Sequence, residues 1–213
     1  MREPTGKYIL HGARGSGAVM VEMAMVHIGI PYDVVEVSLE REEQRGDAYA
    51  AINPQRKIPT LITPAGETLT ESAAILLTLA ERYPDAPLLP PVGSPERAQA
   101  VRWLIFIVAE LYSLVEINDY PARFAGSPDT VNTVRERVRA IWRERWLIVE
   151  KAIAGKPWLL ASGLCVSDFA IATVSRWAQQ KTWRPDNVPR IEAIAAALAD
   201  HATVGPLWRH HFG

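Results

Sequence analysis

Three short stretches of the chain carry groups that could bind a small ligand. Ser16 stands in the glycine-rich turn 12–17, and Glu71 and Ser72 open an expected helix. Backbone N–H groups at a helix start lack intrahelical partners, so both positions suit an anion. Each pattern also fits a simpler interpretation, an N-cap at Ser16 and an ordinary helix start at 71–72. The third stretch, Ile58–Pro59, precedes an expected strand, where the proline either initiates the strand or shapes a tight turn.

Other residues with reactive or ligating side chains do not form a site in the sequence. Cys165 is the one cysteine, which excludes a disulfide within the chain and a cysteine-rich metal site. We expect it to be a buried, inert group. His210 and His211 are adjacent, and neighbouring side chains rarely converge on one metal ion. The sequence therefore predicts no metal site.

The elements that position the three stretches follow from hydrophobic periodicity in the first part of the chain. Strands are expected at 8–11, 32–37, 58–63 and 67–69, and helices at 16–28 and 71–83. Gly29 and Pro31 end the first helix, because glycine reaches positive φ and proline cannot continue a helix. The β-α-β start predicts a parallel strand pair with a right-handed crossover.

The second part of the chain is expected to be entirely helical. Four prolines between 84 and 93 exclude regular helix and mark a linker. The sequence Ser94-Pro95-Glu96 is a strong helix start, with a capping serine and a proline at the first helical position. The expected helices run from about 95 to 120 and from about 129 to 154, and two more begin near Cys165 and near Pro189.

Four segments together resemble the glutathione transferase family, in particular its bacterial members. They are the turn 12–17, the stretch Asn-Pro-Gln-Arg-Lys-Ile-Pro-Thr-Leu at 53–61, the stretch Leu-Thr-Glu-Ser-Ala-Ala-Ile at 69–75, and the helix start at 165–169. The resemblance implies an α/β, thioredoxin-like domain in 1–83, a linker in 84–93, and an all-helical bundle domain in 94–213. It also implies that glutathione is the co-substrate.

The resemblance assigns glutathione contacts to five residues. It implies a cis Ile58–Pro59 bond, with the Ile58 N–H and C=O pairing with the cysteinyl part of glutathione like an added strand. Ser72 and the helix start would bind the γ-glutamyl carboxylate, and Glu71 would meet the α-amino group. Lys57 would reach toward the glycyl end.

The resemblance places the activation of the glutathione thiol in the turn 12–17. A free thiol is only a few per cent ionised at neutral pH, and lowering its pKa by two units is worth about 2.7 kcal/mol. A hydroxyl hydrogen bond from Ser16 at the start of the helix can supply this stabilisation. Backbone N–H groups of Gly15 or Gly17 are the alternative donors, and Arg14 is a lesser candidate.

Several departures from the family pattern narrow the expected chemistry. No cysteine stands in the N-terminal half, so mixed-disulfide chemistry on a protein thiol is not expected. Arg56 replaces the usual glycine of its motif. The serine-serine-cysteine run of maleylacetoacetate isomerases is absent, so that activity is not favoured. Cys165 takes the place of a capping serine or threonine, and Asp168 can still bond a backbone N–H there.

These observations lead to one functional expectation and two alternatives. We expect a transferase that conjugates glutathione to small hydrophobic electrophiles and acts as a homodimer. The alternatives are a non-catalytic binding or assembly module and a glutathione-dependent peroxidase or reductase. A net charge of −1 gives no footprint for nucleic acid or membrane surfaces. The first residues lack the apolar stretch of a signal peptide, so a cytoplasmic location is expected.

Overall fold

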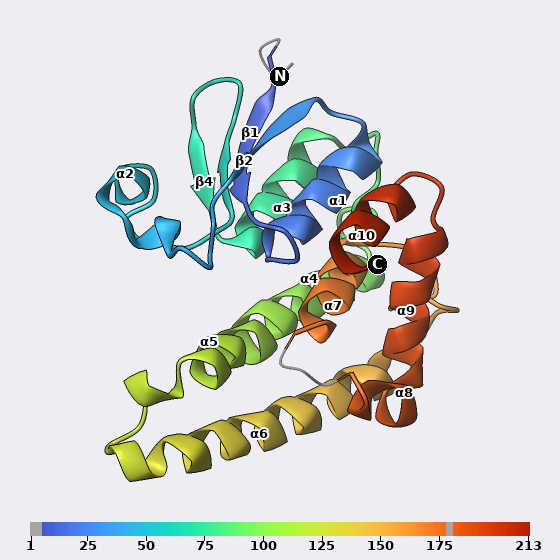
Figure 1. Cartoon of the computed structure of the whole chain (residues 1–213). Helices are drawn as coiled ribbons and strands as arrows, with labels where there is room; N and C mark the ends of the chain where they lie inside the picture. The colour runs from blue at the N-terminus through green and yellow to red at the C-terminus, as the bar shows by residue number, and fades with distance from the viewer. Residues whose placement is uncertain (1–5, 178–180) are drawn as a thin grey trace. The chain divides into compact units, whose positions relative to one another are not determined.

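The computed structural model describes residues 6–177 and 181–213 (Figure 1). The expectation that the chain begins without a signal peptide concerns mainly residues 1–5, which lie outside this description. The described residues form two compact units. The first contains the residues up to Leu88 together with Leu198–Gly213, and the second contains Leu89–Ala197.

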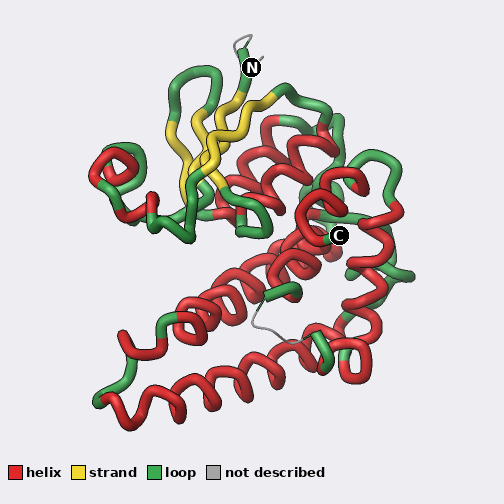
Figure 2. The backbone as a smooth tube through the Cα atoms, in the orientation of Figure 1, coloured by secondary structure: helices red, strands yellow, loops and turns green. Residues whose placement is uncertain are grey.

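The first unit is built on a four-stranded sheet. Its strands are β1 (Tyr8–Gly12), β2 (Tyr32–Glu36), β3 (Thr60–Ile62) and β4 (Thr68–Thr70), in the order β2-β1-β3-β4. The pair β1–β2 is parallel, as the β-α-β pattern predicts, and the other two pairs are antiparallel. Figure 2 shows the four strands side by side. This is the predicted thioredoxin-like arrangement.

Two helices pack against each other in the first unit, α1 (Ala18–Ile28) and α3 (Ser72–Arg82). Every residue of α1 from Ala18 to Met25 is buried, so this helix forms much of the core. The helix ends at Gly29, whose φ of 80° lies in the left-handed region that glycine adopts readily. Gly12 and α1 approach closely, because a Cβ at Gly12 would lie 2.4 Å from the Ala18 Cβ.

Short helical segments follow β2, at η1 (Glu43–Arg45) and α2 (Asp47–Ala50). The unit is completed by α10 (Gly205–Phe212), which packs against α1 (Figure 1). The sequence analysis placed this last helix in the helical domain and did not identify it as an element. Its start carries Pro206 in the first turn, a helix-start signal that the sequence already contained.

The regular secondary structure in the described part of the second unit is helical, apart from an isolated bridge between Leu160 and Gly163. The expected helix 95–120 is one continuous helical stretch with a π-helical segment at its middle, and the helices expected near 165 and 189 begin at Val166 and Pro189. The elements are α4 (Pro95–Phe106), η2 (Ile107–Tyr112), α5 (Ser113–Asp119), η3 (Pro121–Arg123), η4 (Pro128–Thr130), α6 (Val131–Ala152), α7 (Val166–Ser175), α8 (Trp183–Asn187) and α9 (Pro189–Asp200).

Helix α7 is the buried centre of the second unit, since all its residues are buried. Asp168 caps its start: one carboxylate oxygen accepts the Cys165 N–H at 2.9 Å and the other accepts the Leu159 N–H at 2.7 Å. Burial raises the pKa of Asp168 to about 6. Cys165 is buried beside it, and burial raises the pKa of its thiol, so the thiol is inert as expected.

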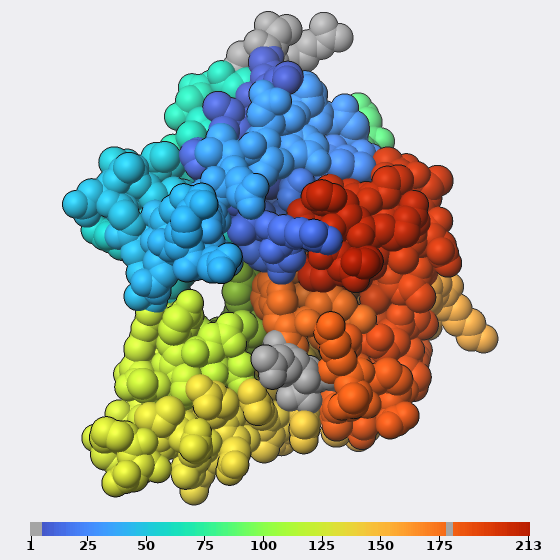
Figure 3. All heavy atoms as spheres, viewed as in Figure 1, coloured from blue at the N-terminus to red at the C-terminus, as the bar shows by residue number. Residues whose placement is uncertain are grey.

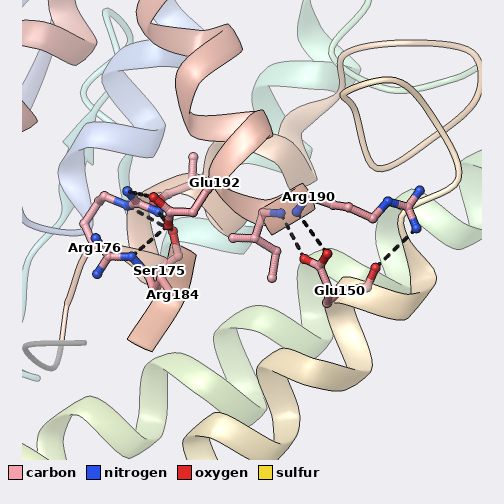
Figure 4. Close-up of polar contacts among 8 residues, drawn as sticks. Glu150, Ser175, Arg176, Arg184, Arg190 and Glu192 are labelled. Atoms are coloured by element: carbon pink, nitrogen blue, oxygen red, sulfur yellow. Dashed lines mark hydrogen bonds and ion pairs between the residues drawn. The ribbon is translucent and has the colours of Figure 1, made fainter. Parts of the chain in front are cut away.

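Charged side chains hold α9 in place, as Figure 4 shows. Glu150 on α6 accepts the N–H groups of Arg190 and Ile191 at 2.9 and 3.0 Å, so a carboxylate caps the first turn of α9. In the same first turn of α9, Glu192 pairs with both Arg176 and Arg184. These contacts join α6, α7 and α8 to one helix. Among the described helices, none is long and apolar enough to cross a membrane.

Candidate functional site

The sheet brings the three stretches singled out in the sequence to one end of the first unit. His11 near the end of β1 pairs with Thr60 at the start of β3, and Thr60 also pairs with Thr70 at the end of β4. Neighbouring strands lie about 4.8 Å apart. The residues just beyond these positions are therefore neighbours: the turn 12–17, Pro59, and Glu71.

The loop before β3 is shaped by two buried side chains. The Asn53 amide donates to the Lys57 carbonyl at 2.7 Å and to Thr60 Oγ1 at 3.1 Å. The Tyr49 hydroxyl donates to the same carbonyl at 2.9 Å and lies 2.8 Å from Thr60 Oγ1. Because both groups bridge the two ends of the loop, they fix the residue between Lys57 and Pro59.

Ile58 is held with its backbone available. The Ile58–Pro59 peptide bond is cis, as the resemblance implies. The Ile58 side chain packs with Val37 and Tyr49, and Ala13 from the turn packs against this cluster. Among the described residues, the Ile58 N–H and C=O make no hydrogen bond. A ligand with its own N–H and C=O can therefore pair with this residue as a strand would.

Arg56 occupies the position where the family motif has glycine, and its backbone conformation shows why glycine suits that position. Its φ of 56° lies in the left-handed region, which glycine adopts at lower cost. The guanidinium is tied to neighbouring segments, donating to the Arg45 carbonyl and to Asp47 Oδ1, the latter at 3.1 Å. These contacts help to hold Arg56 in this conformation.

The start of α3 is open to a ligand. Glu71 is exposed and has a φ of 64°, an uncommon conformation for a residue with a side chain, and such residues cluster at functional sites. Ser72 is only 5% exposed. Within the described part of the chain, its hydroxyl makes no hydrogen bond, and the N–H groups of Ser72 and Ala73 are unpaired. Three donors thus lie next to one another at the start of α3.

Ser16 makes hydrogen bonds inside its own turn. Its hydroxyl donates to the Ala13 carbonyl at 2.7 Å and accepts the N–H groups of Ala13 and Ala18, both at 3.2 Å. The helix itself begins at Ala18, later than the predicted start at Ser16. Ser16 therefore stabilises its own turn, but it is not the N-cap of α1, because that position is Gly17 and no side chain caps the helix. The N-cap interpretation of Ser16 is wrong, and its thiol contact stays a prediction.

The alternative donors of the turn differ from one another. The Gly15 N–H donates to Nδ1 of His211 at 3.2 Å, so it is already engaged. The Gly17 N–H, at the start of α1, makes no hydrogen bond to any residue in the described ranges. Arg14 is exposed on the same turn, and Lys57 is exposed beside the β3 loop.

Sequence reasoning missed three residues that shape this site. Asn53 lies inside a motif that the sequence analysis quoted, but no role was assigned to it. Tyr49 and His211 gave no local signal, because each reaches the site through tertiary packing.

His11 is buried with its ring against Tyr49, and burial lowers the pKa of His11. No group of three metal-ligating side chains gathers within residues 6–177 and 181–213.

The arrangement has the groups needed to bind an extended, charged small molecule. A backbone pair at Ile58 can bind a peptide-like middle section, while the donors at the start of α3 can bind a carboxylate at one end. The start of α1 lies on the other side of Ile58. A group of the ligand placed there would lie near Ser16 and the N–H of Gly17.

Comparison with known proteins gives a consistent match. The model of the N-terminal domain of glutathione S-transferases matches residues 18–82. The uncharacterized GST-like protein YncG of Escherichia coli K12 is 31% identical over 190 residues, 89% of this chain and 91% of that protein. Glutathione S-transferase GstA of Escherichia coli O157:H7 is 28% identical over 89% of this chain and 92% of its own length.

A solved structure matches the fold along nearly the whole chain. The crystal structure of a glutathione transferase homolog from Sulfitobacter, with bound glutathione, superposes with a TM-score of 0.80. The match covers 94% of this chain and 96% of that one, at 23% sequence identity. This likeness establishes the thioredoxin-like domain followed by helices.

Proposed function

Because the chain belongs to the glutathione S-transferase family, we propose that it binds glutathione and conjugates it to small hydrophobic electrophiles. The observation that carries this proposal is the meeting of unpaired groups at one end of the sheet. The Ile58 backbone and the open start of α3 both lack partners among the described residues. Donors and acceptors that the protein itself leaves without partners are available to a ligand at this position.

The proposed contacts follow the shape of glutathione. The cysteinyl N–H and C=O pair with the Ile58 backbone, beside Pro59. The γ-glutamyl carboxylate accepts from the hydroxyl and N–H of Ser72, and Glu71 binds the α-amino group. Lys57 serves the glycyl carboxylate. This order leaves the thiol at the start of α1, where the helix dipole favours an anion.

Thiol activation in this proposal uses Ser16, with the Gly17 N–H as the alternative donor. The Ser16 hydroxyl donates to the Ala13 carbonyl at 2.7 Å. A neutral hydrogen bond is worth about 1 kcal/mol, whereas one to a charged group is worth about 1.5–3 kcal/mol. The hydroxyl proton therefore turns toward a thiolate when one is present, at a net gain.

The experiment that tests the proposal measures binding and turnover separately. Glutathione binding is measured by calorimetry. Conjugation is measured with 1-chloro-2,4-dinitrobenzene as the electrophile, and both measurements are made on the wild type and on Ser16→Ala. Loss of a charge-assisted hydrogen bond predicts a kcat/KM about 10- to 100-fold lower in the variant. Ser127→Ala, at an exposed serine, is the control and should behave as the wild type. Unchanged turnover in Ser16→Ala would remove Ser16 from the mechanism.

One observation favours a second candidate, a module that binds glutathione without turnover. The Ser16 hydroxyl and the Gly15 N–H are both engaged within the protein, so two of the predicted donors are occupied. Calorimetric binding without conjugation in the wild type would support this candidate. A peroxide and a small disulfide, offered as substrates in parallel, test the peroxidase or reductase alternative.

Two further expectations accompany the proposed function. Family membership supports a homodimer, and a two-fold symmetric pair is the common case for soluble oligomers. Sedimentation equilibrium tests this directly: a mass of one chain at micromolar concentration would contradict it. A cytoplasmic location and a role in detoxification stay predictions of the sequence.

A further inference from the structure

The C-terminal helix α10 brings a histidine to the back of the turn 12–17. Trp208 anchors this helix, with 5% of its surface exposed, and its ring contacts that of Phe212 in a tilted arrangement with 4.5 Å between the centroids. The helix packs against α1. Figure 3 shows the C-terminal segment in red lying directly against the dark blue stretch that includes the turn. The last turn of α10, with His210 and His211, therefore meets the start of α1.

His211 makes two polar contacts through its two ring nitrogens. Nδ1 accepts the Gly15 N–H at 3.2 Å. Nε2 lies 3.2 Å from Oε1 of Glu22 on α1, and the side chains are only 6% and 7% exposed. The second contact has the distance of an ion pair but lacks the alignment of a hydrogen bond to any described residue.

These contacts fix the state of the ring. A nitrogen that accepts a hydrogen bond carries no proton, so the neutral ring has its proton on Nε2, which faces Glu22. The Tyr32 hydroxyl approaches the other oxygen of Glu22 at 3.5 Å. Burial and the Glu22 charge raise the pKa of Tyr32 to about 12, so this hydroxyl stays protonated. Glu22 therefore orients the His211 ring, and His211 fixes the turn 12–17 through the Gly15 N–H.

Gly15 is the point where this hold matters most. Its φ of 68° lies in the left-handed region, which glycine adopts readily. The direction of the chain at the residues that follow depends on this conformation. Ser16 follows directly, and Gly17 precedes the first residue of α1. A shift of the backbone at Gly15, where His211 accepts the N–H, would redirect both thiol-activating donors.

We propose that His211 is a positioning residue for thiol activation: it holds the Gly15 N–H so that Ser16 and Gly17 keep their direction toward the thiol. This inference rests on the proposed function, because the thiol is that of glutathione. A residue that only orients a catalytic group through one neutral hydrogen bond should change activity by the value of that bond, about 3- to 10-fold or roughly 1 kcal/mol. His211 touches neither substrate and acts through Gly15.

Three variants separate positioning from a purely structural role. His211→Asn keeps an acceptor oxygen close to the Nδ1 position, whereas His211→Phe keeps the ring volume and removes the acceptor. His210→Phe is the matched control, because His210 is the exposed neighbour on the same helix turn. Melting temperatures of all three establish that the fold and the docking of α10 are retained.

The readouts are the thiolate absorbance of bound glutathione against pH, and kcat and KM for conjugation. Loss of one hydrogen bond predicts a kcat about 3- to 10-fold lower in His211→Phe, with KM for glutathione changed less than about twofold. The thiol pKa should rise in His211→Phe and stay close to the wild-type value in His211→Asn and His210→Phe. Equal thiol pKa and kcat in His211→Phe and the wild type would overturn the inference, as would equal losses in both His211 variants.

A separate measurement keeps the inference distinct from the proposed function. Amide hydrogen exchange at Gly15, followed by NMR without glutathione, reports directly on the hydrogen bond from the Gly15 N–H to His211. Slow exchange in the wild type and in His211→Asn, with about 3- to 10-fold faster exchange in His211→Phe, supports the hold even if the wild type fails to ionise glutathione. In that case the proposed function fails and the role of His211 in thiol activation fails with it. Equal exchange in all three proteins overturns the inference while leaving the proposed function standing.

Discussion

Two helix starts, one in each unit, use similar residues in opposite ways. At the start of α7, the carboxylate of Asp168 accepts two buried N–H groups, one on each of its oxygens. At the start of α3, Glu71 turns outward at a φ of 64°, and the buried Ser72 hydroxyl makes no hydrogen bond to any described residue. Both helices begin with an acidic residue nearby.

The difference separates a stabilising helix start from a binding helix start. A side-chain cap is worth about 1 kcal/mol, and a buried carboxylate that accepts two N–H groups is worth more. The start of α3 forgoes that stabilisation and keeps its donors for another molecule. A helix start that the protein satisfies itself is therefore structural, and one left open in a buried place is a candidate site.

The largest expected effect comes from breaking the closed start of α7. Asp168→Ala leaves the N–H groups of Cys165 and Leu159 buried without acceptors. Neutral pH lies above the raised pKa of Asp168, which is about 6, so the carboxylate is ionised. Both lost bonds are therefore charge-assisted. We expect the free energy of unfolding to fall by about 3 kcal/mol. Urea denaturation, monitored by tryptophan fluorescence, measures this.

Asp129→Ala provides the matched control for that prediction. Asp129 also stands in the first turn of a helical segment, but it is exposed. We expect a change within about 0.5 kcal/mol, as for most surface substitutions. Comparable losses in the two variants would mean that burial does not distinguish them, and the contrast between the helix starts would fail.

The next effect concerns the open start of α3. Ser72→Ala removes a hydroxyl that makes no hydrogen bond to the described residues, so the free energy of unfolding should change by less than about 0.5 kcal/mol. Glutathione affinity, measured by calorimetry, should fall about tenfold, because a bond to a carboxylate is lost. If Ser72→Ala lost stability and kept its glutathione affinity, the start of α3 would be a structural helix start and not a binding one.

Hydrophobic spacing and turn residues in the sequence predicted most of the fold. The strands at 8–11 and 32–37 and the helix at 71–83 lie within a residue of β1, β2 and α3, because a period of two or 3.6 is visible locally. Helix α10 and the grouping of 198–213 with the first unit were missed. That grouping depends on packing between segments far apart in the chain, which periodicity does not encode.

The candidate site was predictable where a motif carried it and not where packing did. The stretches around Ile58 and Ser72 were found through their resemblance to a family. The bonds of Ser16 to Ala13 and Ala18 were not, because a serine at a helix start has the same pattern whether it caps or activates. The contact between His211 and Gly15 joins residues 196 positions apart, and the sequence carries no mark of it.

The smallest expected effect comes from a third helix start, which sharpens the comparison. Ser94 caps α4 in the usual way, accepting the Arg97 N–H at 3.1 Å, and it is partly exposed. Ser94→Ala should lower the free energy of unfolding by about 1 kcal/mol, the usual value of a serine cap, and leave glutathione affinity unchanged. Urea denaturation and calorimetry on this variant and on Ser72→Ala should then give opposite results for the same chemical change. If both serines affect stability alike and neither affects affinity, the open start of α3 is only a poorly capped helix.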